Sequence, residues 1–372
     1  MRIGFDAKRV FHNTSGLGNY SRDVVRMLST QFPEHSYLLY NPKPGKAGRF
    51  NPEKNTTTHY PEGFLYKKFS SAWRRGPIIK QLQKDQIDLF HGLSNELPAG
   101  IERTTIKSVV TIHDVIFLRY PEWYARADRI IHKMKIKSAA LNAHRIIAIS
   151  EQTRDDLVHF LDIPAEKISI IYQGCHPAFK RDYPEEQQIS IRKKFGLPQQ
   201  FLLSVGTVEA RKNLLTVVKS LRYHPLSLIV VGKETKYAEK VKQYIHQENL
   251  EQRVIFLKDV TMEELAIIYR LATVFCYPSV FEGFGIPIIE ALYSRTPVIT
   301  SKGGCFPEAG GPFSFYIDTF DEKMLAEKVN ELLNDAALYQ QVVSESFKFV
   351  QKFNDDAITA QIMELYNQTV QS

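Results

Sequence analysis

The chain has 372 residues, 44% hydrophobic and 24% charged, which is typical of a globular protein with room for two domains. It lacks both the apolar stretch of ~20 residues that spans a membrane and the apolar core of a secretory signal, so we expect a cytoplasmic protein. The net charge of +7 is uneven, because residues 1–180 hold 27 Lys and Arg against 17 Asp and Glu. This basic half indicates either an anionic partner or a solvated basic surface.

The first half alternates short apolar runs with helical patterns. Strands are predicted at Met1–Asp6, Ile87–His91, Ser108–His113 and Arg145–Ser150, and a helix at about Tyr20–Gln31. Continuous apolar runs such as SVVTI and RIIAI are typical of parallel strands that are covered on both faces. The pattern predicts a doubly wound α/β domain over residues 1–180.

The same alternation starts again in the second half, after a polar stretch at 180–200 that we interpret as an interdomain region. Further strands are predicted at Phe201–Val205, Leu226–Gly232, Val254–Leu257, Val274–Tyr277 and Pro297–Thr300. We therefore expect an α/β protein of two Rossmann-like domains, 1–180 and 195–350, facing each other across a cleft. Ligands in such sheets bind beyond the carboxyl ends of the strands.

The three cysteines, Cys175, Cys276 and Cys305, are odd in number and lie far apart, with no Cys-x-x-Cys pair. This spacing argues against a disulfide framework and against a structural zinc site. Three reduced thiols are expected.

The richest stretch for chemistry is YPSVFEGFGIPIIEALYSRTPVIT at 277–300. A strand is followed by a glycine-bearing loop and then by a helix whose first turn suits Pro287. The backbone N–H groups at that helix start would point at an anion together with the helix dipole. These groups belong to Phe284, Gly285 and Ile286.

Two glutamates frame this helix start, Glu282 in the loop and Glu290 on the helix. Carboxylates beside a bound phosphate would accept hydrogen bonds from sugar hydroxyls. Within EGFGIPIIE the pair resembles the E-x7-E motif of the retaining glycosyltransferases of family four, which have the GT-B fold. The resemblance covers nearly the whole chain and is densest at 260–311. It implies that Glu282 contacts the donor sugar and that Glu290 binds the ribose hydroxyls.

A second motif, VGTVEARKNL at 205–214, places Arg211 and Lys212 at the entrance of a helix. Both cations could hold a diphosphate, and arginine can do so bidentately, although an Arg-Lys pair is more often simply solvated. The resemblance assigns Lys212 to the donor diphosphate. Many members carry arginine directly after the glycine, where this chain has Thr207, and Arg211 is expected to supply the missing charge.

The N-terminal loop NTSGLGNYSRDVV places Gly16 and Gly18 before a helix, which leaves room for a phosphate or sugar near the backbone. As a dinucleotide fingerprint the loop fails at its third glycine position, which is Ser21, and this argues against an oxidoreductase. The resemblance favours Gly16 as a contact to the donor. Gly18 is expected at the acceptor side of the cleft.

The fourth motif is TIHDVIF, in which His113 and Asp114 follow a buried strand. A lone histidine is usually structural, but the carboxyl end of a strand is where ligands bind. The resemblance implies that His113 lies near the transferred sugar and that Asp114 orients it or binds an acceptor hydroxyl. It also places Ser150 and Gly174 along the cleft.

Neither an Asp-x-Asp pair, the metal clamp of the other large glycosyltransferase fold, nor a clustered set of His and Cys is found in the sequence. We expect no metal and no other cofactor. The leaving diphosphate would then be stabilised by Lys212, Arg211 and helix N-termini.

Two basic segments, 66–84 and 126–137, mix cations with apolar residues, among them Phe69, Trp73, Ile78 and Ile79 in the first. Either could lie on an anionic membrane, which would place the protein at the inner face of the plasma membrane. An acceptor groove or a plain basic surface explains them equally well. Nothing resembles a nucleic-acid-binding module, so no nucleic-acid partner is expected.

Together with the resemblance, these motifs predict a metal-independent, retaining hexosyltransferase. Its donor is a nucleotide sugar and its acceptor a glycan or a lipid-linked glycan. KRVFHNTSGLGNY and VGTVEARKNL look most like mannosyltransferases of bacterial O-antigen and capsule assembly, so GDP-mannose is the first donor expected and UDP-sugars the second. In the family the last helix crosses back onto the first domain, as 351–372 is expected to do. A nucleotide-sugar epimerase and a non-catalytic nucleotide-sugar-binding protein stay open as alternatives.

Overall fold

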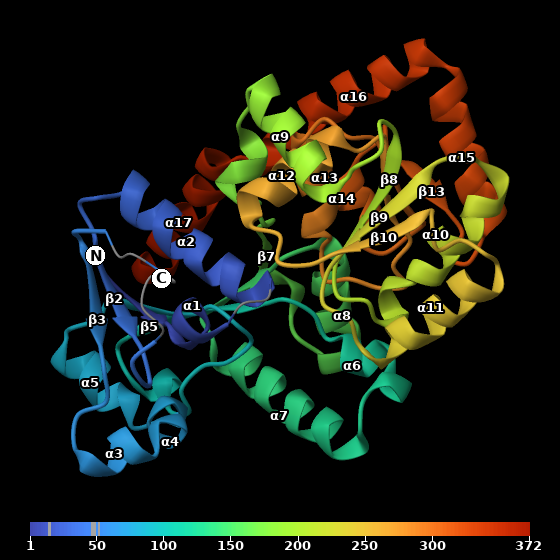
Figure 1. Cartoon of the computed structure of the whole chain (residues 1–372). Coiled ribbons are helices and arrows are strands. Elements are labelled where there is room, and N and C mark those ends of the chain that lie inside the picture. The colour runs from blue at the N-terminus through green and yellow to red at the C-terminus, as the bar shows by residue number, and fades with distance from the viewer. Residues whose placement is uncertain (14–15, 46–49, 51–52) are drawn as a thin grey trace. The chain divides into compact units, whose positions relative to one another are not determined.

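The computed structural model describes residues 1–13, 16–45, 50 and 53–372. The chain forms two compact units, the first from Met1–Gly174 with Asn354–Ser372 and the second from Cys175–Phe353. Each unit holds one parallel sheet with helices around it, as Figure 1 shows. The predicted α/β class with two Rossmann-like domains is confirmed.

The first unit is built on a seven-stranded sheet in the order β3-β2-β1-β4-β5-β6-β7. Its strands are β1 (Arg2–Asp6), β2 (Ser36–Tyr40), β3 (Thr56–His59), β4 (Leu89–Gly92), β5 (Lys107–Ile112), β6 (Arg145–Ala148) and β7 (Ile168–Ile170). Its helices are α1 (Lys8–His12), α2 (Gly16–Gln31), α3 (Phe64–Lys68), α4 (Ser70–Arg75), α5 (Ile78–Lys84), α6 (Ile116–Arg119), α7 (Arg126–Asn142), α8 (Glu151–Leu161) and α17 (Asp355–Gln371). The strand order reverses between β1 and β4, which is where ligands bind in open α/β sheets.

The second unit repeats the design with six parallel strands in the order β10-β9-β8-β11-β12-β13. These are β8 (Phe201–Val205), β9 (Ser227–Val231), β10 (Val254–Leu257), β11 (Val274–Tyr277), β12 (Val298–Ser301) and β13 (Phe315–Ile317). Its helices are α9 (Glu185–Phe195), α10 (Leu214–Ser220), α11 (Lys236–Gln247), α12 (Met262–Leu271), α13 (Ile286–Tyr293), α14 (Phe306–Gly310), α15 (Glu322–Asn334) and α16 (Ala336–Val350). The order reverses between β8 and β11. The motif at 205–214 follows β8, and the motif at 277–300 follows β11.

The strands predicted from apolar runs are present, three of them with the predicted bounds and the rest within two residues. Four strands escaped prediction: β2, and the edge strands β3, β7 and β13. Edge strands bury fewer side chains and β3 reads TTTH, so the apolar signal is weak there. The helix expected from Tyr20 begins at Gly16, because Asn13 Oδ1 accepts a hydrogen bond from the Gly18 N–H and so supports an earlier first turn. The polar stretch at 180–200 contains α9 and lies inside the second unit.

The last helix, α17, packs within the first unit although the chain reaches it from the second. It lies against α2, where Asp355 accepts a 2.8 Å ion pair from Arg26 and Asp356 a 2.8 Å hydrogen bond from Gln31. Its buried face is apolar and carries Ile358, Ile362, Met363, Leu365 and Tyr366. Burial of these side chains is the main force that holds the helix in place.

A buried polar chain connects α17 to the sheet. The Tyr366 hydroxyl lies 2.5 Å from His91 Nδ1, and His91 Nε2 lies 2.8 Å from the Thr111 hydroxyl. Thr111 in turn pairs with the Tyr20 hydroxyl at 2.9 Å, and the Tyr20 ring stands edge-on against His113. Burial lowers the pKa of His91 to about 3 and that of His113 to about 4, so both rings are neutral near pH 7.

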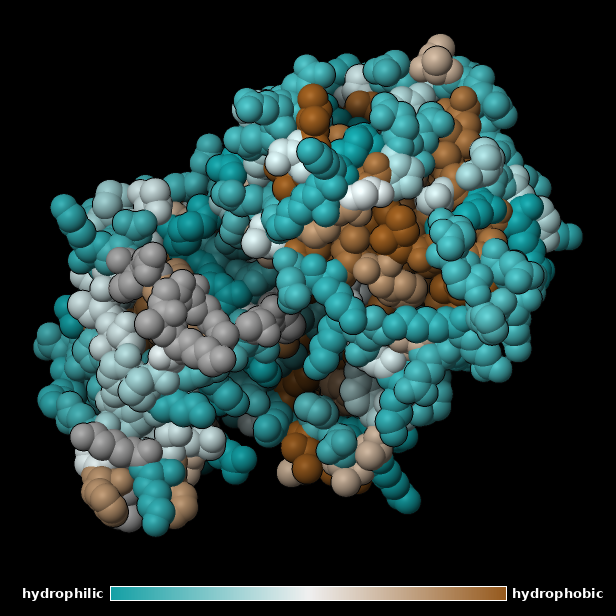
Figure 2. Space-filling view, viewed as in Figure 1, coloured by the Kyte–Doolittle hydropathy of each residue, from teal (hydrophilic) through white to brown (hydrophobic). Residues whose placement is uncertain are grey.

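The two basic segments differ in how they meet solvent. Trp73 and Ile78 belong to the core of the first unit, so the expectation of a surface cluster at 66–84 is wrong for these two side chains. Phe69 is exposed beside them, and Figure 2 shows tan and brown side chains over α3 and α4. On α7, Ile130, Ile131 and Met134 are more than half exposed. Among the described residues no helix is long and apolar enough to cross a membrane.

The buried histidines predict a pH dependence of stability. Their folded pKa values lie below the ordinary 6.5, so the unfolded chain binds more protons as the pH falls below 6.5. The free energy of unfolding should be constant above pH 7 and fall between pH 6.5 and 4, by about 3 kcal/mol from His113 alone. Urea unfolding at several pH values measures this loss.

A His113→Gln variant, which cannot be protonated there, should show a shallower pH dependence. His246, whose side chain is 83% exposed, supplies the matched control, and His246→Gln should leave the dependence unchanged. Equal slopes in all three proteins would contradict the assignment.

Candidate functional site

A cluster of coupled charged side chains in the second unit lies at the carboxyl ends of β8 and β11. Arg211 and Lys212 end a 3₁₀ turn, Ala210–Lys212, after β8. Glu282 lies in the loop between β11 and α13. Because β8 and β11 are neighbours and parallel, their following loops meet at one edge of the sheet.

The Glu282 carboxylate bridges both cations. Lys212 Nζ lies 2.6 Å from Oε1, and Arg211 Nη1 lies 2.8 Å from Oε2. The Ser279 hydroxyl donates a further hydrogen bond of 2.6 Å to Oε1. Three donors therefore fix a carboxylate whose side chain is only 12% exposed.

Backbone contacts lock the two loops to each other. The Arg211 carbonyl accepts a 2.8 Å hydrogen bond from the Val280 N–H, and Arg211 Nη1 donates a 2.6 Å bond to the Phe281 carbonyl. The Asn213 amide donates to the Pro278 carbonyl at 3.2 Å and to that of Thr319 at 2.5 Å. The cations are thus held in a rigid frame, which reduces the entropy lost when a ligand binds.

Electrostatics keeps this cluster ionised. Burial by itself would raise the pKa of Glu282, but the charges of Lys212 and Arg211 outweigh it and lower that pKa to about 2. Burial lowers the pKa of Lys212, and the attraction of Glu282 opposes the change. Lys212 also hydrogen-bonds the Tyr277 hydroxyl, with its Nζ 4.7 Å from the centre of that ring. A buried carboxylate is stable here because two cations compensate it.

The cluster is neutral as it stands. Arg211 Nη2 also holds Glu209 Oε1 at 2.7 Å, so two carboxylates balance two cations. An anionic ligand can bind only if it takes over hydrogen bonds that these carboxylates now receive. The arrangement is therefore suited to an exchange of partners, in which an entering phosphate displaces a carboxylate.

A wide cavity of about 570 Å³ lies at the carboxyl ends of β9 and β10, lined by 231–234 and 257–260. It adjoins the charged cluster, because the Gly206 N–H donates to the Val231 carbonyl and the Lys212 side chain runs beside Gly206. Gly232 allows this approach, since a Cβ there would stand 1.9 Å from the Gly206 carbonyl oxygen. No role was predicted for these loops. The loops follow two correctly predicted strands, β9 and β10, and this position could have marked them as part of a ligand site.

The start of α13 has the expected form. Gly285, with φ at +117°, is the N-cap residue, a backbone angle that favours glycine, and Pro287 stands in the first turn. Phe284 is buried against the Phe353 ring, and Ile286 is half-buried. That their N–H groups bind an anion stays a prediction.

Glu290 is buried on α13, and its Oε2 accepts a 3.2 Å hydrogen bond from the Tyr269 hydroxyl of α12. Burial and the nearby Glu290 charge raise the pKa of Tyr269, which therefore stays a donor. The predicted contact of Glu290 with ribose hydroxyls remains a prediction.

In the first unit, His113 and Asp114 follow β5. The His113 Nε2 lies 3.0 Å from the Leu93 carbonyl, so it carries the hydrogen, and Nδ1 accepts from the Gln173 amide at 3.0 Å. With both nitrogens engaged and its pKa lowered by burial to about 4, His113 is a fixed neutral ring. Asp114 accepts a 3.2 Å bond from the Ile116 N–H and lines a cavity.

The remaining predicted contacts have different surroundings. A Cβ added at Gly16 would meet no atom of the described residues within 4 Å, whereas a Cβ at Gly18 would stand 2.2 Å from the Asn13 carbonyl oxygen. The Ser150 hydroxyl is buried and caps α8 by accepting from the Thr153 N–H. Gly174 is half-buried at the last residue before the second unit. The predicted loop also includes residues 14–15, which lie outside the described part.

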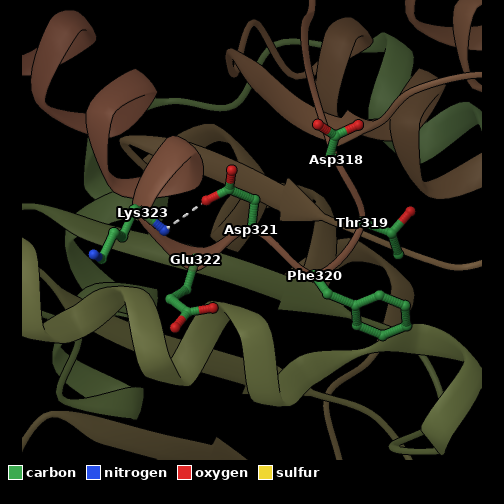
Figure 3. Close-up of a pocket in the computed structure, with 6 residues that line it drawn as sticks. All are labelled: Asp318, Thr319, Phe320, Asp321, Glu322 and Lys323. Carbon is green, nitrogen blue, oxygen red and sulfur yellow. Dashed lines mark hydrogen bonds between the residues drawn. The ribbon is translucent and has the colours of Figure 1, made fainter.

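A further cavity of about 470 Å³ follows β13 and is lined by 318–323 (Figure 3). Its Asp321 caps α15, with Oδ1 accepting from the Lys323 N–H at 3.1 Å. Over the described residues, no three His, Cys, Asp or Glu side chains are grouped as a metal site would need. Cys175, Cys276 and Cys305 are free and buried.

Glu282 predicts a stability effect. Its pKa of about 2 lies below the ordinary 4.5, so the carboxylate stabilises the fold above pH 4.5 and loses this effect as the pH falls toward 2. Glu282→Gln should lower the free energy of unfolding at pH 7 by about 3 kcal/mol, because two buried cations lose their partner. Denaturant unfolding at pH 7 and pH 3 measures it.

The difference between wild type and variant should shrink at pH 3. Glu263→Gln, which removes an exposed partner of Arg181, is the control and should cost well under 1 kcal/mol. A loss at Glu282 no larger than at Glu263 would show that the bridge contributes little.

Two family models match the chain in sequence. Residues 14–179 match Glycosyltransferase Family 4, and residues 187–349 match Glycosyl transferases group 1. The two matches correspond to the two units and together cover most of the chain.

Curated relatives agree with these matches. The chain is 26% identical to an O-antigen chain mannosyltransferase B of Escherichia coli over 98% of its own length and 99% of that protein. It is 29% identical to the O-antigen chain mannosyltransferase RfbU of Salmonella typhimurium over 58% of its own length and 57% of that protein.

Among solved structures, the chain is similar to Alr3699/HepE of Anabaena, crystallised in complex with UDP and glucose. The TM-score is 0.76 at 19% identity, over 99% of each chain. Similarity at this identity shows the fold, and the predicted fold class is thereby confirmed.

Proposed function

Because the chain belongs to the glycosyltransferases that combine a Family 4 domain with a group 1 domain, we propose that it transfers a mannosyl group from GDP-mannose. The acceptor is a glycan or lipid-linked glycan of a surface polysaccharide, and the anomeric configuration is retained. The mannosyl assignment is supported by the two O-antigen mannosyltransferases similar to the chain, one of them over nearly its full length. UDP-sugars are the second choice of donor.

The observation that carries the proposal is the bridge from Glu282 to Lys212 and Arg211. A diphosphate, like a carboxylate, offers pairs of oxygens that accept bidentate hydrogen bonds, and it carries more charge, so it competes well for these two cations. As it binds, Glu282 is released and becomes an acceptor for hydroxyls of the donor sugar. This exchange of partners thus gives the diphosphate two cations and gives the donor sugar a free carboxylate.

The same cations assist the transfer. Cleavage of the bond between sugar and phosphate leaves added negative charge on the diphosphate, and Lys212, Arg211 and the α13 N-terminus lie preorganised to stabilise it. The acceptor hydroxyl attacks the sugar and its proton passes to the departing phosphate. Two protein cations can neutralise that charge, which supports transfer without a metal.

The cavity beside Gly232 is the proposed site of the nucleobase. Asp259 lines it with an exposed carboxylate that hydrogen-bonds no residue of the described part. Guanine presents two adjacent N–H donors, on N1 and N2, that one carboxylate can accept together, whereas uracil presents one. This difference supports GDP over UDP as the carrier of the sugar.

The first functional prediction separates binding from transfer. GDP at 100 times its Kd should stabilise the protein by about 2.7 kcal/mol with EDTA present. Lys212→Met should weaken GDP binding at least ~10-fold, because a charged hydrogen-bond donor is lost. Glu282→Gln should bind GDP as well as wild type or better, since a competing anion is removed, and yet lose transfer by ~100-fold.

Calorimetry with GDP, and transfer assays from GDP-mannose with the product anomer read by NMR, supply the measurements. Lys219→Met on α10 removes a half-buried lysine that has no ion pair with the cluster and should change neither. Absence of GDP and UDP binding, or binding that EDTA abolishes, would contradict the proposal.

The nucleobase prediction concerns Asp259. Asp259→Asn offers one acceptor and one donor, so it loses the double contact with guanine and fits the alternating edge of uracil. The ratio of GDP to UDP affinity should fall ~10-fold. Competition binding with both nucleotides measures it, with Glu239→Gln on α11 as the control. An unchanged ratio would remove Asp259 from base recognition.

A further inference from the structure

Glu209 is the second carboxylate of the charged cluster, and the proposed function gives it no role. Its Oε1 accepts a 2.7 Å ion pair from Arg211 Nη2. The other terminal nitrogen of that guanidinium, Nη1, is taken by the Glu282 carboxylate and by the Phe281 carbonyl. Each terminal nitrogen of Arg211 therefore already holds an acceptor before any donor arrives.

The two carboxylates of the cluster are held very differently. The Glu282 side chain is 12% exposed, and it pairs with Lys212 and Arg211 and accepts a hydrogen bond from Ser279. The Glu209 side chain is 37% exposed, and Arg211 is its one ion-pair partner among the described residues. A single, partly exposed ion pair costs little to break, whereas removing a partner from a buried carboxylate is expensive. Glu209 is therefore the carboxylate that leaves Arg211 more easily.

The backbone of Glu209 is fixed although its side chain is not. The residue is the N-cap of the 3₁₀ turn after β8. Its N–H donates a 2.9 Å hydrogen bond to the Thr207 carbonyl, and its own carbonyl accepts one of 3.0 Å from the Lys212 N–H. A displaced Glu209 side chain can thus rotate away but stays within reach of Arg211. A competitor attached in this way acts at a high effective concentration.

Glu209 also acts on the second cation through its charge. Burial lowers the pKa of Lys212, and the charges of Glu282 and Glu209 both oppose this change. In the proposed function Glu282 turns to the donor sugar and stays in the site. The number of cations that face the diphosphate then depends on Glu209: both when its side chain has rotated into solvent, and one when it has returned.

We propose that Glu209 is a tethered counterion that competes with the donor diphosphate for Arg211 and speeds release of the nucleotide after transfer. The inference rests on the proposed function, in which Arg211 and Lys212 hold the diphosphate. Glu209 rotates off Arg211 when the donor binds. Once the sugar has been transferred, Glu209 recovers the guanidinium, and the nucleoside diphosphate loses one of its two cations.

The test compares wild type with Glu209→Gln, which keeps the shape of the side chain and removes its charge. Calorimetry measures GDP affinity, and surface plasmon resonance on immobilised full-length protein measures the rate of GDP release. Glu209→Gln should bind GDP ~10-fold more tightly and release it ~10-fold more slowly, because a charged competitor for a charged donor is removed. Guanosine, which carries no phosphate, should bind both proteins equally.

The direction of the change separates this role from a structural one. If Glu209 only held Arg211 in position, its loss would weaken GDP binding. A double-mutant cycle tests whether the effect passes through Arg211: in an Arg211→Gln background, adding Glu209→Gln should change GDP affinity by less than ~2-fold. Glu248→Gln is the matched control, because it removes a carboxylate of 32% exposure from an ion pair with Arg222 and should leave GDP binding unchanged.

Tighter binding and slower release in Glu209→Gln, both absent from the Arg211→Gln background, would support the inference. Weaker or unchanged GDP binding, an unchanged release rate, or an equal gain in the Arg211→Gln background would overturn it. In each of these cases GDP binding by wild type leaves the proposed function standing. Absence of both GDP and UDP binding in wild type would instead overturn the proposed function, and the inference with it.

Discussion

The second unit depends on one carboxylate held between two cations. Glu282 is buried, and burial opposes its charge, but Lys212 and Arg211 each occupy one of its oxygens. The same bridge holds the two cations near each other, where they would otherwise repel. Because the loops after β8 and β11 also exchange backbone hydrogen bonds, the cluster cannot relax by moving apart. The result is a charge-balanced, extensively hydrogen-bonded site. We expect an entering anion to replace one of its carboxylates.

Both units place their chemistry by the same rule of parallel sheets. Strands buried on both faces consist mostly of apolar residues, so charged side chains lie mainly at the strand ends and in the loops that follow them. Those loops gather at one edge, and the reversal of strand order opens a space between two of them. In the second unit this space holds the Glu282 cluster, and in the first unit it holds the cavity lined by Arg9. The same architecture thus places different side chains at the corresponding edge of each sheet.

The motif EGFGIPIIE at 282–290 could be recognised from the sequence because the backbone geometry of a helix start favours particular residue types. Pro287 stands in the first turn of α13, as its position in the sequence indicated, and the preceding Gly285 takes a backbone angle of +117°. The bounds of β8, β10 and β11 followed from apolar runs for a similar reason. Weak edge strands such as β3 gave no such signal, because their side chains meet solvent.

In the basic first half, the sequence alone did not distinguish buried side chains from exposed ones. The segment 66–84 mixes cations with aromatic residues, and only the packing shows that Trp73 is core while Phe69 is exposed. Likewise, the resemblance placed His113 near the transferred sugar, and only the structure shows that both of its ring nitrogens are hydrogen-bonded. The partners that decide this, Leu93 and Gln173, are distant along the chain and could not be inferred from spacing.

By itself, the sequence determined the fold class, the identity of the charged residues at the strand ends, and the resemblance that links them to glycosyl transfer. These follow from periodicity and local motifs, which depend on neighbouring residues. The tertiary structure decided which charges neutralise each other: Glu282 with Lys212 and Arg211, and Glu96 with Lys135. Electrostatic pairing depends on distance through space, and residues 70 positions apart become partners only when the sheet brings their loops together.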